Sequence, residues 1–146
     1  MLRIALALLV PLLMAREAEA EPAANAVIVQ SGSTNRAGFH IAIDAAGNAE
    51  FVPTGRRSSE PDKSAEPLHK KIPGELARRF HADLDIAKPF AALPSVRCMK
   101  SASFGFTLRV EFKGETTPDL SCGDGGNTAL RNLIRDVNEI AALFRE

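Results

Sequence analysis

The stretch that decides the fold is SFGFTLRVEFKGETTPDLSC, residues 103–122. Apolar and polar residues alternate over residues 104–112, so the apolar ones share one face of an extended chain, whereas a helix would scatter them around its circumference. Gly114 then supplies a turn, and residues 116–120 supply a shorter return strand that Pro118 places at the edge of a sheet. The stretch therefore predicts a β-hairpin with one buried face. The residues expected on that face are Phe104, Phe106, Leu108, Val110 and Phe112.

The two cysteines of the chain, Cys98 and Cys122, bracket this hairpin. A hairpin brings its ends together, so in an exported protein we expect a disulfide across its base. The bridge closes a loop of about 25 residues, which the chain-entropy model values at roughly 3–3.5 kcal/mol. A nucleophilic thiol is the rival interpretation, but His40, His69 and His81 lie outside any cysteine-protease signature. A zinc site has less support, because no CxxC knuckle and no HxxxH pair occurs.

The first 20 residues have the pattern of a secretory signal peptide. Arg3 precedes an apolar run at residues 4–14, and Ala18-Glu19-Ala20 fits the small-x-small rule for signal peptidase. The run is shorter than the about 20 residues that a membrane-spanning helix needs. We therefore expect a mature chain of residues 21–146 that is periplasmic or secreted and has no membrane association after cleavage.

Charge and composition argue against nucleic acid as a partner. The chain carries 18 basic and 18 acidic residues, and loss of the leader removes two of each, so the net charge stays at zero. No basic excess exists to attract a phosphate backbone. The absence of Trp and Tyr removes the residues that dominate protein-binding hot spots, although eight Phe remain.

The mature chain is long enough for one domain with a modest core. Its alternating strands predict an antiparallel sheet with one wet face, and both halves follow one plan of hairpin and then helix. We predict an α+β fold, a sheet of about four strands from two hairpins with two helices on one face, in ββα-ββα order. The expected elements are a strand at 27–29, a hairpin of 39–44 and 49–52, a helix at 75–87, the hairpin of 103–120, and a helix from Asn127 or Thr128 to the end.

Two polar segments interrupt this pattern. Residues 53–73 hold four prolines and many charges, which is typical of a mobile connection. Residues 31–38, SGSTNRAG, form a glycine-bearing loop. Loops commonly carry recognition, so we expect any contact surface in these two segments.

Neither catalytic nor cofactor-binding nor metal-binding residues are predicted. GxSxG, HExxH and SxxK do not occur in the chain. GDGGN at residues 123–127 is compatible with an anion cradle, but a sharp entry into a helix needs glycines anyway. Asp119, Asp124 and Asn127 do not have the spacing of an EF-hand calcium loop.

One family comparison follows from the layout. AGFHIAIDAAGNAEFV at residues 37–52, the helix containing ELARRF, SFGFTLRVEF and a C-terminal helix resemble small exported bacterial proteins of unassigned function. The layout is also similar to that of the emfourin-type inhibitors of thermolysin-like metalloproteases, over about residues 26–145. The resemblance implies an inhibitor-like role. The leader and the cysteine pair depart from the cytoplasmic members of that group, and no inhibitory motif is matched residue by residue.

Together these features favour an exported, non-enzymatic domain, a protein-binding or inhibitor-like module whose partner lies in the cell envelope or outside the cell. The alternative is a small hydrolase or a thiol-dependent redox protein that uses Cys98 or Cys122. An envelope scaffold without a discrete ligand is a third hypothesis.

Overall fold

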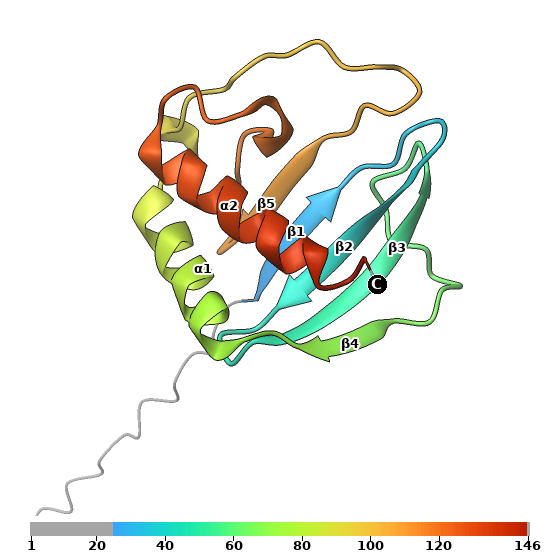
Figure 1. Ribbon diagram of the computed structural model, residues 1–146, viewed down its shortest axis with the longest axis horizontal. Coiled ribbons are helices and arrows are strands. Elements are labelled where there is room, and N and C mark those ends of the chain that lie inside the picture. Colours follow the sequence, from blue (N-terminus) through green and yellow to red (C-terminus); the bar gives the residue numbers. More distant parts are fainter. Residues whose placement is uncertain (1–24, 146) are drawn as a thin grey trace, which may run out of the picture.

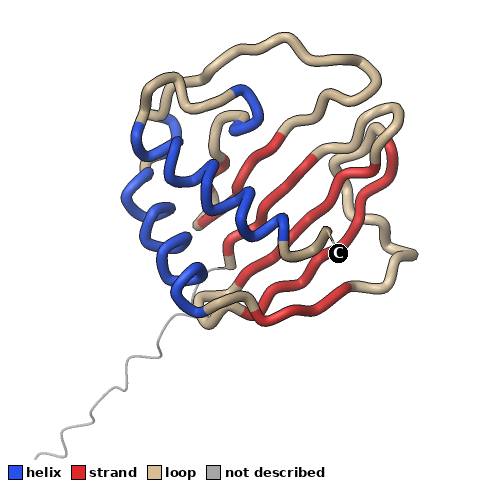
Figure 2. Tube along the Cα trace, in the orientation of Figure 1, coloured by secondary structure: helices blue, strands red, loops and turns tan. Residues whose placement is uncertain are grey.

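The computed structural model describes residues 25–145, and the predicted leader at residues 1–20 lies outside that range. One antiparallel sheet of six strands carries two helices on one face (Figures 1 and 2). The strand order across the sheet is β4-β3-β2-β1-β5-β6. The strands are β1 (Ala26–Gln30), β2 (Ala37–Ile43), β3 (Asn48–Arg56), β4 (Leu68–Lys71), β5 (Leu108–Phe112) and β6 (Glu115–Thr116). The helices are α1 (Gly74–Ala87) and α2 (Thr128–Ala142), with short 3-10 turns η1 (Phe90–Ala92) and η2 (Leu120–Cys122).

The α+β class and the single antiparallel sheet agree with the sequence-based prediction, but the expected four strands and ββα-ββα order are only partly correct. Besides the four strands of the two hairpins, the sheet contains β1, which confirms the strand expected at residues 27–29, and β4, which was not predicted. β1 pairs with β2 on one side and with β5 on the other, so it joins the two predicted hairpins into one sheet. β4 pairs with β3 and lies within residues 53–73, the predicted connection, whose mobility stays a prediction. β4 shows little apolar pattern because it is a short, lysine-bearing edge strand.

The core lies between the helices and the inner face of the sheet. Inward residues alternate along β1, β2 and β5, as a half-buried sheet requires. The apolar stripes of α1 and α2 cover this face, and the side chain of Asn127 caps α2 by accepting a hydrogen bond from the N–H of Leu130. Phe90 in η1 is also buried. The largest fully buried side chains include Ile28, Ile41, Phe80, Val110, Leu133 and Ile140.

The predicted strand at residues 104–112 is wrong in its first half. β5 begins only at Leu108, and Phe104 is 64% exposed instead of buried. A tight turn replaces the extended chain there: the N–H of Gly105 donates to the carbonyl oxygen of Ser101 at 2.7 Å. A Cβ at Gly105 would collide with the same oxygen, so the glycine permits the turn.

The return strand is also shorter than predicted. β6 contains two residues, although pairing continues to Thr117, whose N–H donates to Val110 O at 2.9 Å. The N–H of Val110 in turn donates to Thr117 Oγ1 at 3.0 Å. Gly114 has φ +77°, which confirms the predicted turn. Pro118 then ends the pairing, because it has no N–H to donate.

A buried pair of carboxyl groups joins the two helices. Asp136 on α2 is fully buried, and its Oδ1 accepts hydrogen bonds from Arg79 Nε and Arg135 Nε, both at 2.9 Å. Arg135 Nη2 also donates to Asp83 Oδ2 on α1 at 3.1 Å. Burial, and then the neighbouring carboxyl of Asp136, raise the pKa of Asp83.

Replacing Asp83 with Asn should change how stability depends on pH. A carboxyl with a raised folded-state pKa contributes stability that is fully present below its unfolded pKa and is lost as pH rises through the folded pKa. We therefore expect the wild type to lose stability relative to Asp83→Asn as pH rises from about 4 to about 8. Urea unfolding across this range measures the difference, and Asp85→Asn on the same helix controls for the loss of one charge. A difference that stays constant with pH would contradict the assignment.

Candidate functional site

Two loops, at residues 31–36 and 97–107, meet the end of β3 and the turn after it, residues 55–59, at one end of the sheet, and we call these three segments together the loop end (Figure 1). The backbone joins them directly. The N–H of Gly32 donates to Ser58 O at 2.8 Å, and the N–H of Asn35 donates to Ser103 O at 3.1 Å. A Cβ at Gly32 would lie 2.5 Å from the carbonyl oxygen of Gly55, so this close approach requires glycine. The structure thus brings the two predicted contact segments together and adds a third.

Residues 97–107 have no regular secondary structure, yet they are held at many points. Hydroxyl groups of residues 31–34 replace the backbone ladder where β1 and β5 end, so each contact fixes a main-chain group that would otherwise face water. The bonds run from Ser33 Oγ to Ser103 O (2.9 Å), from Thr34 Oγ1 to Ala102 O (3.1 Å) and from the N–H of Thr107 to Ser31 Oγ (2.8 Å).

The carboxylate of Asp119 anchors the base of this loop. It accepts hydrogen bonds from the N–H of Leu108 (3.0 Å) and from both the N–H (3.0 Å) and Oγ (2.7 Å) of Ser121, and it pairs with the ammonium of Lys100. Lys100 Nζ also donates to Ser121 Oγ at 2.8 Å and to Phe106 O at 2.5 Å. Burial raises the pKa of Asp119, but the Leu108 N–H, Lys100 and Ser121 together outweigh it and leave the pKa below its usual value.

A disulfide joins Cys98 to Cys122, with the two Cα atoms 5.3 Å apart. The sequence places this bridge at the base of a hairpin, whereas the structure places it across the base of residues 99–107 and η2. Cys122 directly follows Ser121, so the bridge and the Asp119 cluster hold the same two segments. Both cysteines of the chain are therefore occupied by a structural cross-link.

Two large apolar side chains of the loop end face solvent. Met99 is fully exposed and Phe104 is 64% exposed, although exposed apolar groups of this size are few on residues 25–145. Met99, Phe104 and Phe106 surround a hollow of about 270 Å³ beside Cys98. A wider groove of about 710 Å³, lined by hydroxyl groups and by Arg57, shares Lys100, Ser101 and Gly105 with this hollow. The loop end thus pairs an apolar hollow with a polar groove.

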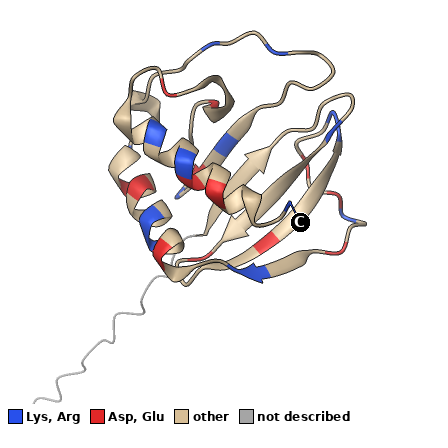
Figure 3. Ribbon diagram, viewed as in Figure 1, with Lys and Arg blue, Asp and Glu red and all other residues tan. Residues whose placement is uncertain are grey.

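The loop end is also strongly basic. Its three segments contain five basic residues and no acidic residue, in a chain whose net charge is zero (Figure 3). Lys100 is neutralised by Asp119, but Arg36, Arg57 and Arg97 make no ion pair within residues 25–145. The guanidinium carbon of Arg36 lies 6.0 Å from the ring centroid of Phe106, so cationic and apolar groups are adjacent. The basic residues are Arg36, Arg56, Arg57, Arg97 and Lys100.

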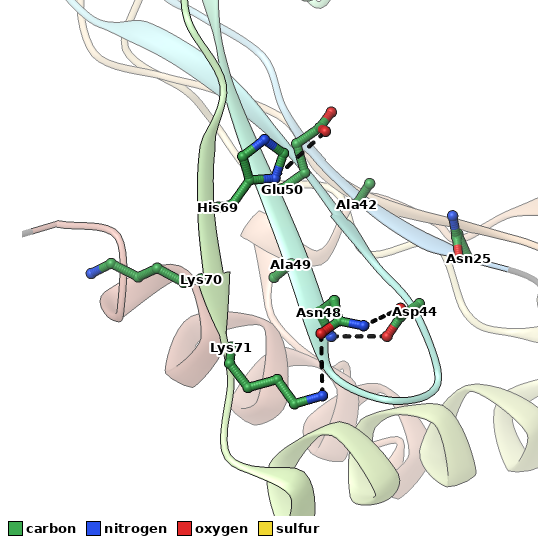
Figure 4. A pocket seen from close by; sticks show the side chains of 9 residues that line it. All are labelled: Asn25, Ala42, Asp44, Asn48, Ala49, Glu50, His69, Lys70 and Lys71. Atoms are coloured by element: carbon green, nitrogen blue, oxygen red, sulfur yellow. Dashed lines mark hydrogen bonds and ion pairs between the residues drawn. The ribbon is translucent and has the colours of Figure 1, made fainter.

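A second hollow, of about 510 Å³, lies at the opposite end of β2, β3 and β4 (Figure 4). Asn48 bonds to Asp44 through Nδ2 at 2.6 Å, and Lys71 Nζ donates to Asn48 Oδ1 at 3.2 Å, so these groups satisfy one another. His69 Nδ1 lies 3.8 Å from Glu50 Oε2, and both side chains are largely exposed. The described lining offers no Ser, Thr or Cys, so the His–Glu pair has no nucleophile beside it.

The other two histidines contact the backbone or pack against aromatic side chains. His40 Nε2 contacts Ser59 O at 2.5 Å and ties the connection after β3 to the sheet. His81 lies between Phe80 and Phe112, with ring centroids 5.8 and 5.7 Å away. None of the three histidines lines the hollow beside the disulfide.

The side chains of the glycine-rich segment before α2 form hydrogen bonds within the segment and with the first turns of the helix. Asp124 accepts hydrogen bonds from the N–H of Gly126 (2.8 Å) and from Arg131 Nε (2.7 Å), and Asn127 caps the helix. The carboxylate of Asp119 forms an ion pair with Lys100. Over residues 25–145, no group of three or more His, Cys, Asp or Glu side chains is placed to hold a metal ion.

No protein-family model, curated protein or solved structure matches the chain. The similarity of layout to the emfourin-type inhibitors therefore stays a prediction. Neither α1 nor α2 is long and apolar enough to cross a bilayer, and these are the α-helices of the part that the structure describes.

Residues 97–107 were not predicted as a contact surface, because Phe104 and Phe106 were assigned to a strand. Two signals were present in the sequence. Ser101 and Gly105 are typical turn residues, and the three segments contain five basic residues and no acidic one.

Removing the disulfide should loosen the loop end. In the double variant Cys98→Ser/Cys122→Ser, we expect the free energy of unfolding to fall by about 3 kcal/mol, because the bridge no longer restricts the unfolded chain. Urea unfolding measures this loss. Chymotryptic cleavage after Phe104 should also become faster, and the wild type treated with a reducing agent should reproduce both effects. An unchanged cleavage rate would show that the other contacts hold the loop without the bridge.

The stability that Asp119 contributes should be lost in acid. A carboxylate with a lowered folded-state pKa contributes stability that is present above its unfolded pKa and is lost as pH falls through the folded pKa. We therefore expect the stability difference between the wild type and Asp119→Asn to shrink as pH falls from about 7 to below about 4. Urea unfolding at several pH values tests this, and an undiminished difference in acid would contradict it.

Proposed function

We propose that this protein is an exported, non-catalytic domain that binds another protein through its loop end. The observation that carries the proposal is the exposure of Met99 and Phe104 on a segment that is nevertheless fixed by a disulfide and by hydrogen bonds from a neighbouring loop. Exposed apolar patches commonly mark interaction sites. A segment that is already ordered loses less conformational entropy when it binds.

An inhibitor-like mode is consistent with this geometry, because a rigid loop can occupy a partner's site without rearranging. Export is supported by the leader pattern at residues 1–20 and by the disulfide, which persists in oxidising compartments. The thiol-dependent alternative has less support, because both sulfur atoms are bonded to each other. A hydrolase has no nucleophile beside the His69–Glu50 pair among the described residues.

A localisation experiment tests export. The full chain, expressed with its own leader, should be found in the periplasm or the medium, and its mass should correspond to cleavage near Ala20 with two hydrogens lost to the disulfide. Recovery from the cytoplasm with the leader intact and both thiols open to alkylation would contradict the proposal.

A capture experiment tests the surface. Cross-linking in periplasmic and secreted fractions of the source organism should identify a saturable partner that the wild type and Ile86→Ala retain. Ile86 is a matched control because it is an exposed apolar residue on α1, away from the loop end. Phe104→Ala should weaken binding about tenfold or more, as truncation of a central aromatic anchor does. Equal binding by Phe104→Ala would place the contact elsewhere.

A further inference from the structure

We infer that the partner surface is acidic and inserts one apolar side chain between Met99, Phe104 and Phe106. This inference rests on the proposed function and adds the chemistry of the partner. Three observations carry it: the uncompensated charge of the loop end, the hollow beside the disulfide, and the hydrogen bonds that hold the segments carrying them together.

The charge of the loop end requires carboxylates opposite it. Arg57 donates one hydrogen bond, from Nε to Thr34 Oγ1 at 3.2 Å, and makes no ion pair within the described chain. Its backbone has φ +57°, an unusual conformation for a residue with a side chain, and its N–H donates to Ser33 O at 3.3 Å. The guanidinium group is thus held by its bond to Thr34 and still has donors to offer. Bidentate pairing with a carboxylate is the strongest interaction available to it.

The hollow has the size of one apolar side chain. A cavity of about 150 Å³ lined by apolar groups accepts benzene, so a hollow of about 270 Å³ has room for a Phe or Leu side chain. Met99 is flexible and polarisable, which lets it close around such a group. Phe104 and Phe106 offer ring surfaces for stacking.

The hollow and the groove adjoin along one segment. Lys100, Ser101 and Gly105 line both of them, so a partner that covers this segment would contact the hollow and the groove together. The partner would place its apolar group at Phe104 and its carboxylates toward Arg57 and Arg36.

A protein fits these features better than a lipid surface. Membrane docking relies on apolar side chains that enter the bilayer, and although Met99 and Phe104 are exposed, they border a hollow of about 270 Å³ that a single side chain can fill and a flat bilayer surface cannot. The chain also has no Trp or Tyr, the residues that are enriched at membrane interfaces.

Selection from a random peptide library displayed on phage tests the inference. The full chain, purified with its disulfide intact, is the target, and synthetic versions of the enriched peptides are then titrated by fluorescence polarisation. We expect the enriched peptides to combine one large apolar residue with several Asp or Glu residues. Phe104→Ala should raise their Kd about tenfold or more. Arg57→Gln should raise it about threefold and reduce its dependence on salt.

Two variants serve as controls, because Ile86→Ala and Arg78→Gln change exposed groups on α1 and should leave the Kd unchanged. Enriched peptides without acidic residues, or a Kd that Arg57→Gln leaves unchanged, would overturn the inference but leave the proposed surface intact. A Kd that Phe104→Ala leaves unchanged would overturn both the inference and the proposed surface. The inference also fails if no peptide is enriched and the protein instead binds vesicles of phosphatidylcholine with phosphatidylglycerol, or dimerises in sedimentation experiments.

Discussion

The pairing of β1 with strands on both of its sides determines where everything else lies. Ile28 lies opposite Ile41 of β2 and Val110 of β5, so one short strand joins β2, β3 and β4 to the second hairpin. Without β1, the two hairpins would be separate and each too small to be stable by itself. Because all three strands are antiparallel neighbours, the chain that leaves β1 at Gln30 emerges beside the chain that enters β5 at Leu108. The loop end is a direct consequence of this register.

Past the paired ends of β1 and β5, side chains take over the hydrogen bonding of main-chain groups. Hydroxyl groups of residues 31–34 bond to main-chain groups of residues 102–107, and Asp119 accepts the N–H of Leu108. The disulfide joins the same region to η2. Each contact is modest, since a typical hydrogen bond contributes about 1 kcal/mol net. Their combination fixes a loop that has no regular secondary structure of its own.

The sequence predicted the parts of the fold that depend on local periodicity. The hairpin at residues 39–52 and both helices lie near their expected positions, because their apolar residues repeat at the period of a strand or a helix. Alternation failed at Phe104 and Phe106, where a turn held by distant hydroxyl groups exposes the first ring. β4 could not be predicted because an edge strand buries few side chains. The candidate site was only half predicted, since the meeting of its three segments depends on tertiary pairing.

The same contacts that make the loop end rigid also determine which of its groups are available for binding. Ser33, Thr34, Lys100 and the carboxylate of Asp119 already have partners, so a second molecule gains little from them. The arginines without ion pairs and the exposed rings are different, because they face water on a surface that does not need to rearrange. Burial of a ring surface is favourable at roughly 25 cal/mol per Å², and a carboxylate placed against arginine adds direction to that contact. In the proposed complex, specificity would therefore come from the groups that the fold leaves unpaired, and affinity would come from the order that the fold has already imposed.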